Sequence, residues 1–351
     1  MKRMLIRKVM VWAAVVMTAA IVAGIGPGTA LVRAQQQTGQ VLIAGTQGEL
    51  EILQLRPNFY MIAGAGANIA LQVGPDGAVV VDSGTEEKAG AVIAAIRKLS
   101  PEPIRFVIDT SVRPDHAGGN EKVAKAGETM FNIINNPQNL AMTNGGAAGI
   151  IASENVLRRM STPDSALDVT APKGAWPTDA FLERRKYMYF NNEGIELVHQ
   201  PAAVTDGDTI VFFRRSDVVA AGDILDLARF PMIDVARGGS IQGEIDALNK
   251  LVELAIPSIP MDWRDDGTLV IAGHGRVCDQ FDIVEYRDMV TIIRDRIRDL
   301  IRQGETLEQV NEAAPTAGYT RRYGADSGPW TTNMFVEAVY KSLIQAQGNK
   351  K

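Results

Sequence analysis

Cysteine is almost absent from this chain: Cys278 is the only one among 351 residues. An internal disulfide is therefore excluded even in an oxidising compartment, so the stability of the fold must come from its core. The sequence also has no low-complexity run, which argues against a disordered or fibrous protein. Its hydrophobic content of 46% and charged content of 22% are close to the averages for folded domains. We therefore expect a packed globular protein.

The first 34 residues differ in composition from the rest of the chain. Basic residues precede an apolar run from Val9 to Ile25, and small residues stand where a signal peptidase reads the chain before Gln35. This pattern predicts a secretory signal peptide over residues 1–34 and a periplasmic or secreted protein. An uncleaved membrane anchor is the alternative, because the apolar run is nearly long enough to span a bilayer.

The chain also lacks any stretch of Lys and Arg with interleaved aromatic residues, and its formal net charge is -5. Residues 1–34 contain five basic residues and no acidic ones, so their removal takes the charge from -5 to about -10. A surface of this charge repels nucleic acid and anionic lipid. We therefore expect no nucleic-acid partner and, after cleavage of the signal, no membrane partner. The expected partner is a small-molecule substrate or ligand.

Hydrophobic patterns predict two strand-rich halves. The first half has predicted strands over 53–62, 68–73, 78–83 and 104–109, with a helix over 86–99 and another near 148–160. The second half has predicted strands over 186–190, 195–199, 208–214, 218–222 and 269–272, with a helix over 243–254. Two similar halves of this kind indicate two packed sheets with helices outside them.

The last part of the chain has a helical pattern. An amphipathic helix is predicted over 284–303, a shorter one after a capping box at Thr306, and a last one over 332–345. We therefore divide the mature chain into a main domain, 35–283, and a C-terminal helical extension, 284–351. These helices are expected to pack on the main domain or on a second subunit of a homo-oligomer.

Two of the three histidines follow predicted strands, beside carboxylates and glycines. Asp115 and His116 precede Ala-Gly-Gly-Asn, His274 lies between two glycines, and Asp223 follows Gly222 at the end of a strand. α/β proteins place their chemistry in loops of this kind, and carboxylate oxygen and imidazole nitrogen are ligands that suit zinc. The two histidines and two aspartates would together make one metal site.

Several motifs in fixed order resemble the metallo-β-lactamase superfamily. They are Asn68, Val81-Asp-Ser-Gly84, Asp115-His-Ala-Gly-Gly-Asn120, Pro201-Ala-Ala-Val-Thr-Asp-Gly-Asp208, Gly222-Asp223 and Gly273-His-Gly275. The resemblance covers residues 53–278, and motifs in a fixed order are stronger support than any one of them. It implies an αββα sandwich, the metallo-β-lactamase fold, with its site at one edge.

The chain departs from the family at the ligands of the first metal. In that family the loop reads Thr-His-x-His-x-Asp-His, and a further histidine stands at the place of Val204. Here the two leading histidines are Ser111 and Arg113. Val has no donor atom, Arg is a permanent cation and Ser is a weak ligand, so none replaces an imidazole.

The residues that match the second metal of the family are present. They are Asp115, His116 and His274, with Asp223 at the place of the bridging carboxylate. The resemblance therefore implies one divalent ion, zinc before others, and no second metal. We predict that Asp115 and Arg113 take part in catalysis, and that the Arg113 guanidinium occupies the place of a cation and pairs with Asp223 or Asp115.

Two functions remain open at this point. The first is a one-metal hydrolase of an ester, lactone or lactam outside the cytoplasm. The second is a catalytically inactive pseudoenzyme that binds a small anionic molecule or a protein partner. Each residue also has a simpler interpretation: Asp115 and His116 would cap a helix, and His274 would be a hydrogen-bonded loop residue. Asp82 is expected to support the site loop by hydrogen bonding.

Overall fold

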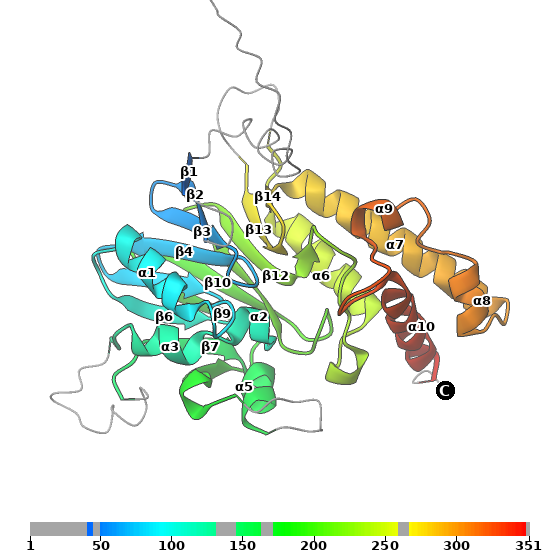
Figure 1. Cartoon of the computed structure of the whole chain (residues 1–351), viewed down its shortest axis with the longest axis horizontal. Helices are drawn as coiled ribbons and strands as arrows, with labels where there is room; N and C mark the ends of the chain where they lie inside the picture. The colour runs from blue at the N-terminus through cyan, green and yellow to red at the C-terminus, as the bar shows by residue number, and fades with distance from the viewer. Residues whose placement is uncertain (1–40, 45–49, 131–144, 163–170, 259–266, 349–351) are drawn as a thin grey trace, which may run out of the picture. The chain divides into compact units, whose positions relative to one another are not determined.

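The computed structural model of the chain describes residues 41–44, 50–130, 145–162, 171–258 and 267–348 (Figure 1). The predicted signal peptide, residues 1–34, lies outside the described residues. Among the helices that are described, none is both long and apolar enough to cross a membrane. Residues 41–351 form one compact unit. The boundary expected between 283 and 284 stays a prediction.

The first half of the chain forms an eight-stranded sheet whose strands lie in chain order. They are β1 (Val41–Ala44), β2 (Glu51–Arg56), β3 (Phe59–Ala63), β4 (Ile69–Gly74), β5 (Gly77–Val81), β6 (Ile104–Ile108), β7 (Gly149–Ser153) and β8 (Asp179–Phe181). β1 to β5 are antiparallel, whereas β5 to β8 run parallel. The single strand predicted over 53–62 is a hairpin, because Pro57 and Asn58 form a turn in its middle.

The second half forms a six-stranded sheet. Its strands, in spatial order, are β14 (Val277–Cys278), β13 (Leu269–His274), β12 (Val218–Asp226), β11 (Asp208–Phe213), β10 (Glu193–Gln200) and β9 (Arg185–Phe190). Only β12 and β13 pair in parallel in this sheet as described. His199 lies near the end of β10, and its Nε2 is 2.8 Å from the Asp206 carbonyl oxygen, in keeping with a structural role.

The two sheets pack face to face through alternating side chains of their strands. In β5, Val79 and Val81 join the core between the sheets, whereas Ala78 and Val80 join a core on the outer face. This alternation follows from the two-residue period of a strand. Between the sheets, the rings of Phe59 and Phe213 lie edge to face, with 4.7 Å between their centroids.

Helices cover both outer faces, which confirms the αββα sandwich (Figure 1). The helices of the first half are α1 (Ala89–Leu99), α2 (Pro114–Ala117), α3 (Asn120–Lys125), α5 (Glu154–Ser161) and the 3-10 turn η1 (Lys173–Ala175). Those of the second half are η2 (Val235–Arg237), α6 (Ile241–Leu254), α7 (Gln280–Arg302), α8 (Leu307–Glu312), α9 (Thr320–Tyr323) and α10 (Thr332–Gly348).

The helix predicted near residues 148–160 is wrong in its first half. Gly149–Ser153 is the strand β7, which pairs with β6, and the helix α5 begins only at Glu154. A short apolar run has no distinctive period, so its neighbours decide between strand and helix. Here Ile150 and Ile151 are buried on opposite faces of the sheet, which a helix could not achieve.

The C-terminal helices pack on the second sheet through α6 and α7. Phe335 of α10 is fully buried and stacks on Phe230, with 4.7 Å between ring centroids and 5° between planes. Tyr323 lies against Phe230 from α9. α7 begins earlier than predicted, at Gln280, because the Asp279 side chain caps it. Association with a second subunit through these helices stays a prediction.

Replacing Phe335 by Ala tests how much the C-terminal helices stabilise the sandwich. We expect the free energy of unfolding to fall by about 3 to 5 kcal/mol, because a large fully buried ring is lost. Urea unfolding followed by circular dichroism measures the change. Phe281→Ala is the control, since Phe281 is 59% exposed and should cost less than about 0.5 kcal/mol. Equal losses in both variants would contradict the expectation.

Candidate metal centre

The site lies where two pairs of parallel strands end. β5 and β6 belong to the first sheet and β12 and β13 to the second, and polar residues stand at or just beyond the ends of all four. Asn68 joins the two sheets here, because its Nδ2 donates 2.9 Å hydrogen bonds to the carbonyl oxygens of both Ala272 and Gly275. Parallel strands bring the segments that follow them to one edge of a sheet.

His116 is held by Asp82. Asp82 Oδ1 accepts a hydrogen bond of 2.8 Å from the Thr110 backbone N–H, and Oδ2 lies 2.8 Å from His116 Nδ1. Both side chains are buried, and Asp82 adopts a φ of 63°, which is uncommon outside glycine. With Nδ1 engaged, His116 presents Nε2 to the site. Asp82 therefore has the supporting contacts that the sequence predicts for it.

An irregularity in β12 shapes the second-sheet side of the site. The register with β13 shifts between Gly222 and Asp226, whereas in a regular strand residues 223 and 226 would point to opposite faces. Here Asp223 and Asp226 both offer an oxygen within 4.8 Å of a ring nitrogen of His274. Gly222 has a φ of 56°, and a Cβ on it would lie 2.5 Å from Thr110 Oγ1, so this turn requires glycine.

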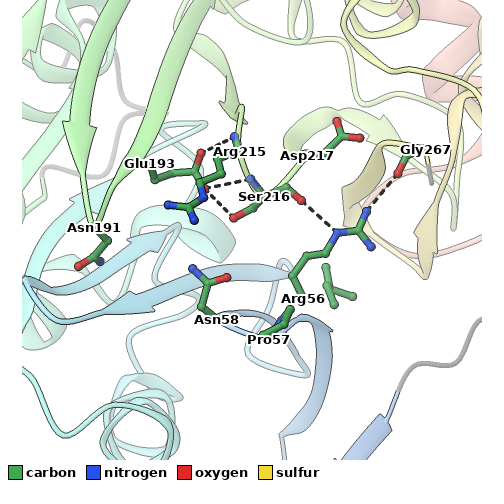
Figure 2. A pocket seen from close by; sticks show the side chains of 10 residues that line it. Arg56, Pro57, Asn58, Asn191, Glu193, Arg215, Ser216, Asp217 and Gly267 are labelled. Atoms are coloured by element: carbon green, nitrogen blue, oxygen red, sulfur yellow. Dashed lines mark hydrogen bonds between the residues drawn. The ribbon is translucent and has the colours of Figure 1, made fainter. Parts of the chain in front are cut away.

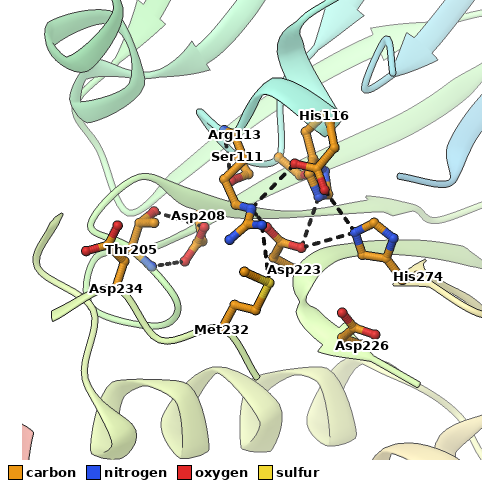
Figure 3. A network of polar contacts seen from close by, with 12 residues as sticks. Ser111, Arg113, His116, Thr205, Asp208, Asp223, Asp226, Met232, Asp234 and His274 are labelled. Atoms are coloured by element: carbon orange, nitrogen blue, oxygen red, sulfur yellow. Dashed lines mark hydrogen bonds and ion pairs between the residues drawn. The ribbon is translucent and has the colours of Figure 1, made fainter. Parts of the chain in front are cut away.

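Arg113 lies between the two carboxylates that the sequence proposes as its partners. Its Nε is 3.0 Å from Asp223 Oδ2 and 3.5 Å from Asp115 Oδ1, and the guanidinium is surrounded by polar groups (Figure 3). Asp115 Oδ2 is 3.2 Å from His274 Nε2. The site thus brings together all five residues that the sequence singles out: Arg113, Asp115, His116, Asp223 and His274.

The simpler interpretations of Asp115 and His274 stay predictions. Asp115 lies in the first turn of α2, whose N-cap residue, Arg113, makes no side-chain capping hydrogen bond. The Asp115 carboxylate also faces Arg113 and His274. Asp115 and His274 therefore contact each other across the site as well as belonging to their own loops.

The charges of the site keep its carboxylates ionised. Burial by itself would raise the pKa of Asp223, but the charges of His116 and Arg113 outweigh it and lower the pKa to about 2. Burial also opposes ionisation of Asp115, yet its hydrogen bond with His274 and the nearby positive charges hold its pKa well below the usual range. Both carboxylates are therefore anionic at neutral pH. The same contacts with Asp223 and Asp82 outweigh burial and raise the pKa of His116, so its ring must lose a proton before Nε2 can bind an ion.

The arrangement fits one divalent ion. The Nε2 atoms of His116 and His274 are buried, and each faces a carboxylate oxygen. His116 Nε2 is 3.0 Å from Asp223 Oδ1, and His274 Nε2 is 3.7 Å from the same oxygen. Ligands of a tetrahedral zinc ion stand about 3.3 Å from one another. Two imidazole nitrogens and two carboxylates at this spacing are therefore suited to hold a shared ion when both rings are neutral.

The place of the family's first metal has no comparable ligand set. Ser111 and Val204 are both fully buried there, and the third position is Arg113. Within the described residues, the groups of side chains that could hold an ion are Asp115, His116 and His274, and Asp223, Asp226 and His274. Both groups contain His274.

Three residues near the site were not identified from the sequence. Asp226 Oδ2 is 2.6 Å from Arg229 Nε, and Arg229 Nη1 is 3.4 Å from the sulfur of Met232. The spacing Asp223-Ile-Leu-Asp226 at the end of β12 was a usable indication for Asp226. Nothing in the local pattern distinguishes Arg229 or Met232, because both belong to the loop after β12.

A cavity of about 700 Å³ opens beside the site. Arg113 and Asp115 border it, and much of the rest of its wall is apolar, including Val112, Met160 and Pro172. Charged side chains of both signs also line it: Glu86, Glu87, Arg159, Asp234 and Arg237. A cavity with apolar and charged parts can hold a small molecule.

A second pocket, of about 810 Å³, is lined by the turns between β2 and β3, β9 and β10, and β11 and β12, at the ends of these strands away from the candidate metal centre (Figure 2). There Arg56 donates hydrogen bonds to the carbonyl oxygens of Ser216 and Gly267, at 3.0 and 3.1 Å. Glu193 accepts from the backbone N–H groups of Arg215 and Ser216. These polar groups hold the turns together, so we assign this pocket a structural role.

Comparison with known proteins agrees with this architecture. Residues 63–259, more than half of the chain, match the family model described as the metallo-beta-lactamase superfamily. The chain belongs to this superfamily. The predicted αββα fold and the family resemblance are thereby confirmed.

Two known proteins give the extent of the likeness. A linear primary-alkylsulfatase of Pseudomonas sp. (strain ATCC 19151) is 22% identical over 276 residues, which are 70% of this chain and 50% of that protein. The structure of the sec-alkylsulfatase Pisa1 from Pseudomonas sp. matches with a TM-score of 0.56 and 15% identity, over 83% of this chain and 49% of that one. A double mutant of the same enzyme matches with a TM-score of 0.59 and 15% identity, with the same coverage. The chain therefore spans about half the length of these relatives, and the likeness to the solved structures concerns the fold.

Replacing Arg113 by Gln tests whether its guanidinium acts as a built-in cation. In a buffer with a chelator, we expect the free energy of unfolding to fall by about 3 kcal/mol, because buried Asp223 loses one of its two positive partners and keeps only His116. Denaturant unfolding measures the loss, and added zinc should reverse part of it.

Arg302→Gln is the matched control for Arg113→Gln. Arg302 is 65% exposed and pairs with Asp299 on the surface of α7, so its loss should cost less than about 1 kcal/mol. If the two variants lose the same stability, Arg113 does not hold the site together.

Proposed function

We propose that this protein is a one-metal hydrolase whose ion is held by Asp115, His116, Asp223 and His274. The observation that carries the proposal is the convergence of two buried imidazole nitrogens on two carboxylates that stay ionised. Zinc suits this mixture of nitrogen and oxygen ligands. A bound divalent ion would supply Lewis acidity and a lowered pKa for water.

The residues of the chain would divide the remaining work. Asp82 fixes the ring of His116, so that Nε2 stays directed at the ion site. Arg113 borders the cavity and carries a permanent charge, which suits it to hold an anionic oxygen of the substrate beside the ion. The Asp115 carboxylate is anionic, and it contacts Arg113 through Oδ1 and His274 through Oδ2.

Among the ester, lactone and lactam substrates that the sequence suggests, alkyl sulfate esters are our first choice. The relatives described above are named alkylsulfatases. Acidic residues line part of the cavity, but Arg113 offers a cation beside the metal ligands, and Val112 and Met160 form an apolar wall. An anionic head at Arg113 and an apolar chain along this wall would fit that part of the cavity.

The second candidate is a pseudoenzyme that binds a small anionic molecule or a partner. The ion pair between Arg113 and Asp223 favours it, because a guanidinium stands at a position that holds a metal ligand in the family. For either function we propose a periplasmic or secreted location, on the strength of the composition of residues 1–34.

Metal content distinguishes the two candidates. After exposure to zinc, manganese and iron followed by dialysis, we expect elemental analysis to find about one ion per chain, because a single ligand set is complete. His274→Ala should abolish retention. His199→Gln is the control, since His199 lies in β10 and contacts a backbone carbonyl.

A folded protein that retains no ion would contradict the hydrolase and favour the pseudoenzyme. Retention that survives His274→Ala would place the ion elsewhere. If an ion is retained as expected, hydrolysis of a medium-chain alkyl sulfate by the zinc-loaded protein is the next measurement. Release of sulfate that is lost in His274→Ala and kept in His199→Gln would support the proposed activity.

A further inference from the structure

Two arginines direct terminal nitrogens at the same sulfur atom. Arg113 Nη2 lies 3.3 Å from Met232 Sδ, and Arg229 Nη1 lies 3.4 Å from it. The two arginines come from distant parts of the chain, the loop after β6 and the loop after β12. Figure 3 shows Met232 against the Arg113 guanidinium, on the side of Asp223 and away from His116.

Each guanidinium is anchored in the same way. Arg113 Nε is 3.0 Å from Asp223 Oδ2, and Arg229 Nε is 2.6 Å from Asp226 Oδ2. Both aspartates belong to the irregular end of β12, and both are at least 95% buried. The strand therefore holds two arginines side by side through their Nε atoms, and their outer nitrogens face a common point.

The sulfur at that point is a weak partner for two cations. A thioether is a poor hydrogen-bond acceptor, whereas a guanidinium binds carboxylate, sulfate and phosphate oxygens strongly and often through two bonds. Among the described residues, the only hydrogen bonds from the terminal nitrogens of Arg113 and Arg229 go to Met232. The side chains of Arg113 and Arg229 are 24% and 26% exposed, so solutes reach them.

We propose that Arg113 and Arg229 form a clamp for an oxoanion, and that Met232 occupies the clamp until the anion displaces it. Met is unbranched and flexible, so its side chain can leave without a change of the backbone. The ligand class is a singly or doubly charged oxoanion, such as the sulfate group of an ester or a carboxylate. As an account of substrate recognition, the clamp rests on the proposed function. Binding of an oxoanion by the two arginines requires no metal.

Binding of inorganic sulfate to the full mature chain, residues 35–351, tests the clamp. Calorimetric titration is made in a chelator, so that no metal contributes, and acetate is titrated in parallel to compare sulfate with a carboxylate. We expect saturable sulfate binding that weakens about tenfold in Arg229→Gln, because one charged partner is lost. Arg302→Gln removes the same charge from an exposed site and should leave the affinity unchanged.

Two substitutions of Met232 keep the test independent of the arginines. Met232→Glu places a carboxylate of the chain at the clamp, so it should abolish sulfate binding and raise the temperature of unfolding. Met232→Leu has a similar volume and no anionic group, so sulfate binding should persist. Absence of saturable sulfate and acetate binding by the unaltered chain would overturn the proposal, as would equal sulfate affinity in the unaltered chain, Arg229→Gln and Met232→Glu.

The experiments test the clamp and the hydrolase activity separately. Sulfate binding that depends on Arg229, in a protein that retains no zinc or releases no sulfate from alkyl esters, supports the clamp and contradicts the hydrolase. Hydrolysis by a zinc-loaded protein whose sulfate affinity is the same in all variants supports the hydrolase and overturns the clamp.

Discussion

The ion pair between Arg113 and Asp223 is the contact on which the site depends. A carboxylate buried at the junction of two sheets needs a positive partner, because an isolated buried charge is costly. In this chain one partner is covalently attached: Arg113 Nε lies 3.0 Å from Asp223 Oδ2. A tethered cation neither dissociates nor exchanges with solvent. It keeps the carboxylate ionised and correctly placed, but unlike an ion it has no open position at which to activate water.

Asp223 therefore serves two kinds of partner at once. Its Oδ2 faces the guanidinium, and its Oδ1 faces the Nε2 atoms of His116 and His274. One oxygen of the carboxylate thus pairs with a guanidinium while the other faces the two imidazoles. The irregular end of β12 adds Asp226 to the same region, so a second arginine is held beside the first. One distorted strand thus organises both the candidate metal ligands and the cationic side of the site.

Much of the fold and part of the site could be predicted from the sequence. Alternating Val79, Val80 and Val81 identify a strand buried on both faces, and the helix α6 follows from its periodic apolar residues. Around residue 150 the prediction failed, since an apolar run of a few residues takes the structure of its neighbours. The candidate ligands were found because they stand in motifs of fixed order. Arg229 and Met232 were missed, since no motif surrounds them and only the path of the loop after β12 brings them to Arg113.

The sequence by itself determined which chemical groups are available. Compared with the motif of the family, Ser111, Arg113 and Val204 stand in place of imidazoles. Two histidines and two aspartates match the motif, and Arg113 stands among them. Only the tertiary structure decided how these groups pair. The pairing depends on distances of a few ångströms between strand ends far apart in the chain, and on a shift of register in β12. Electrostatic and hydrogen-bonding energies vary steeply over such distances, so the order of residues along the chain cannot supply them.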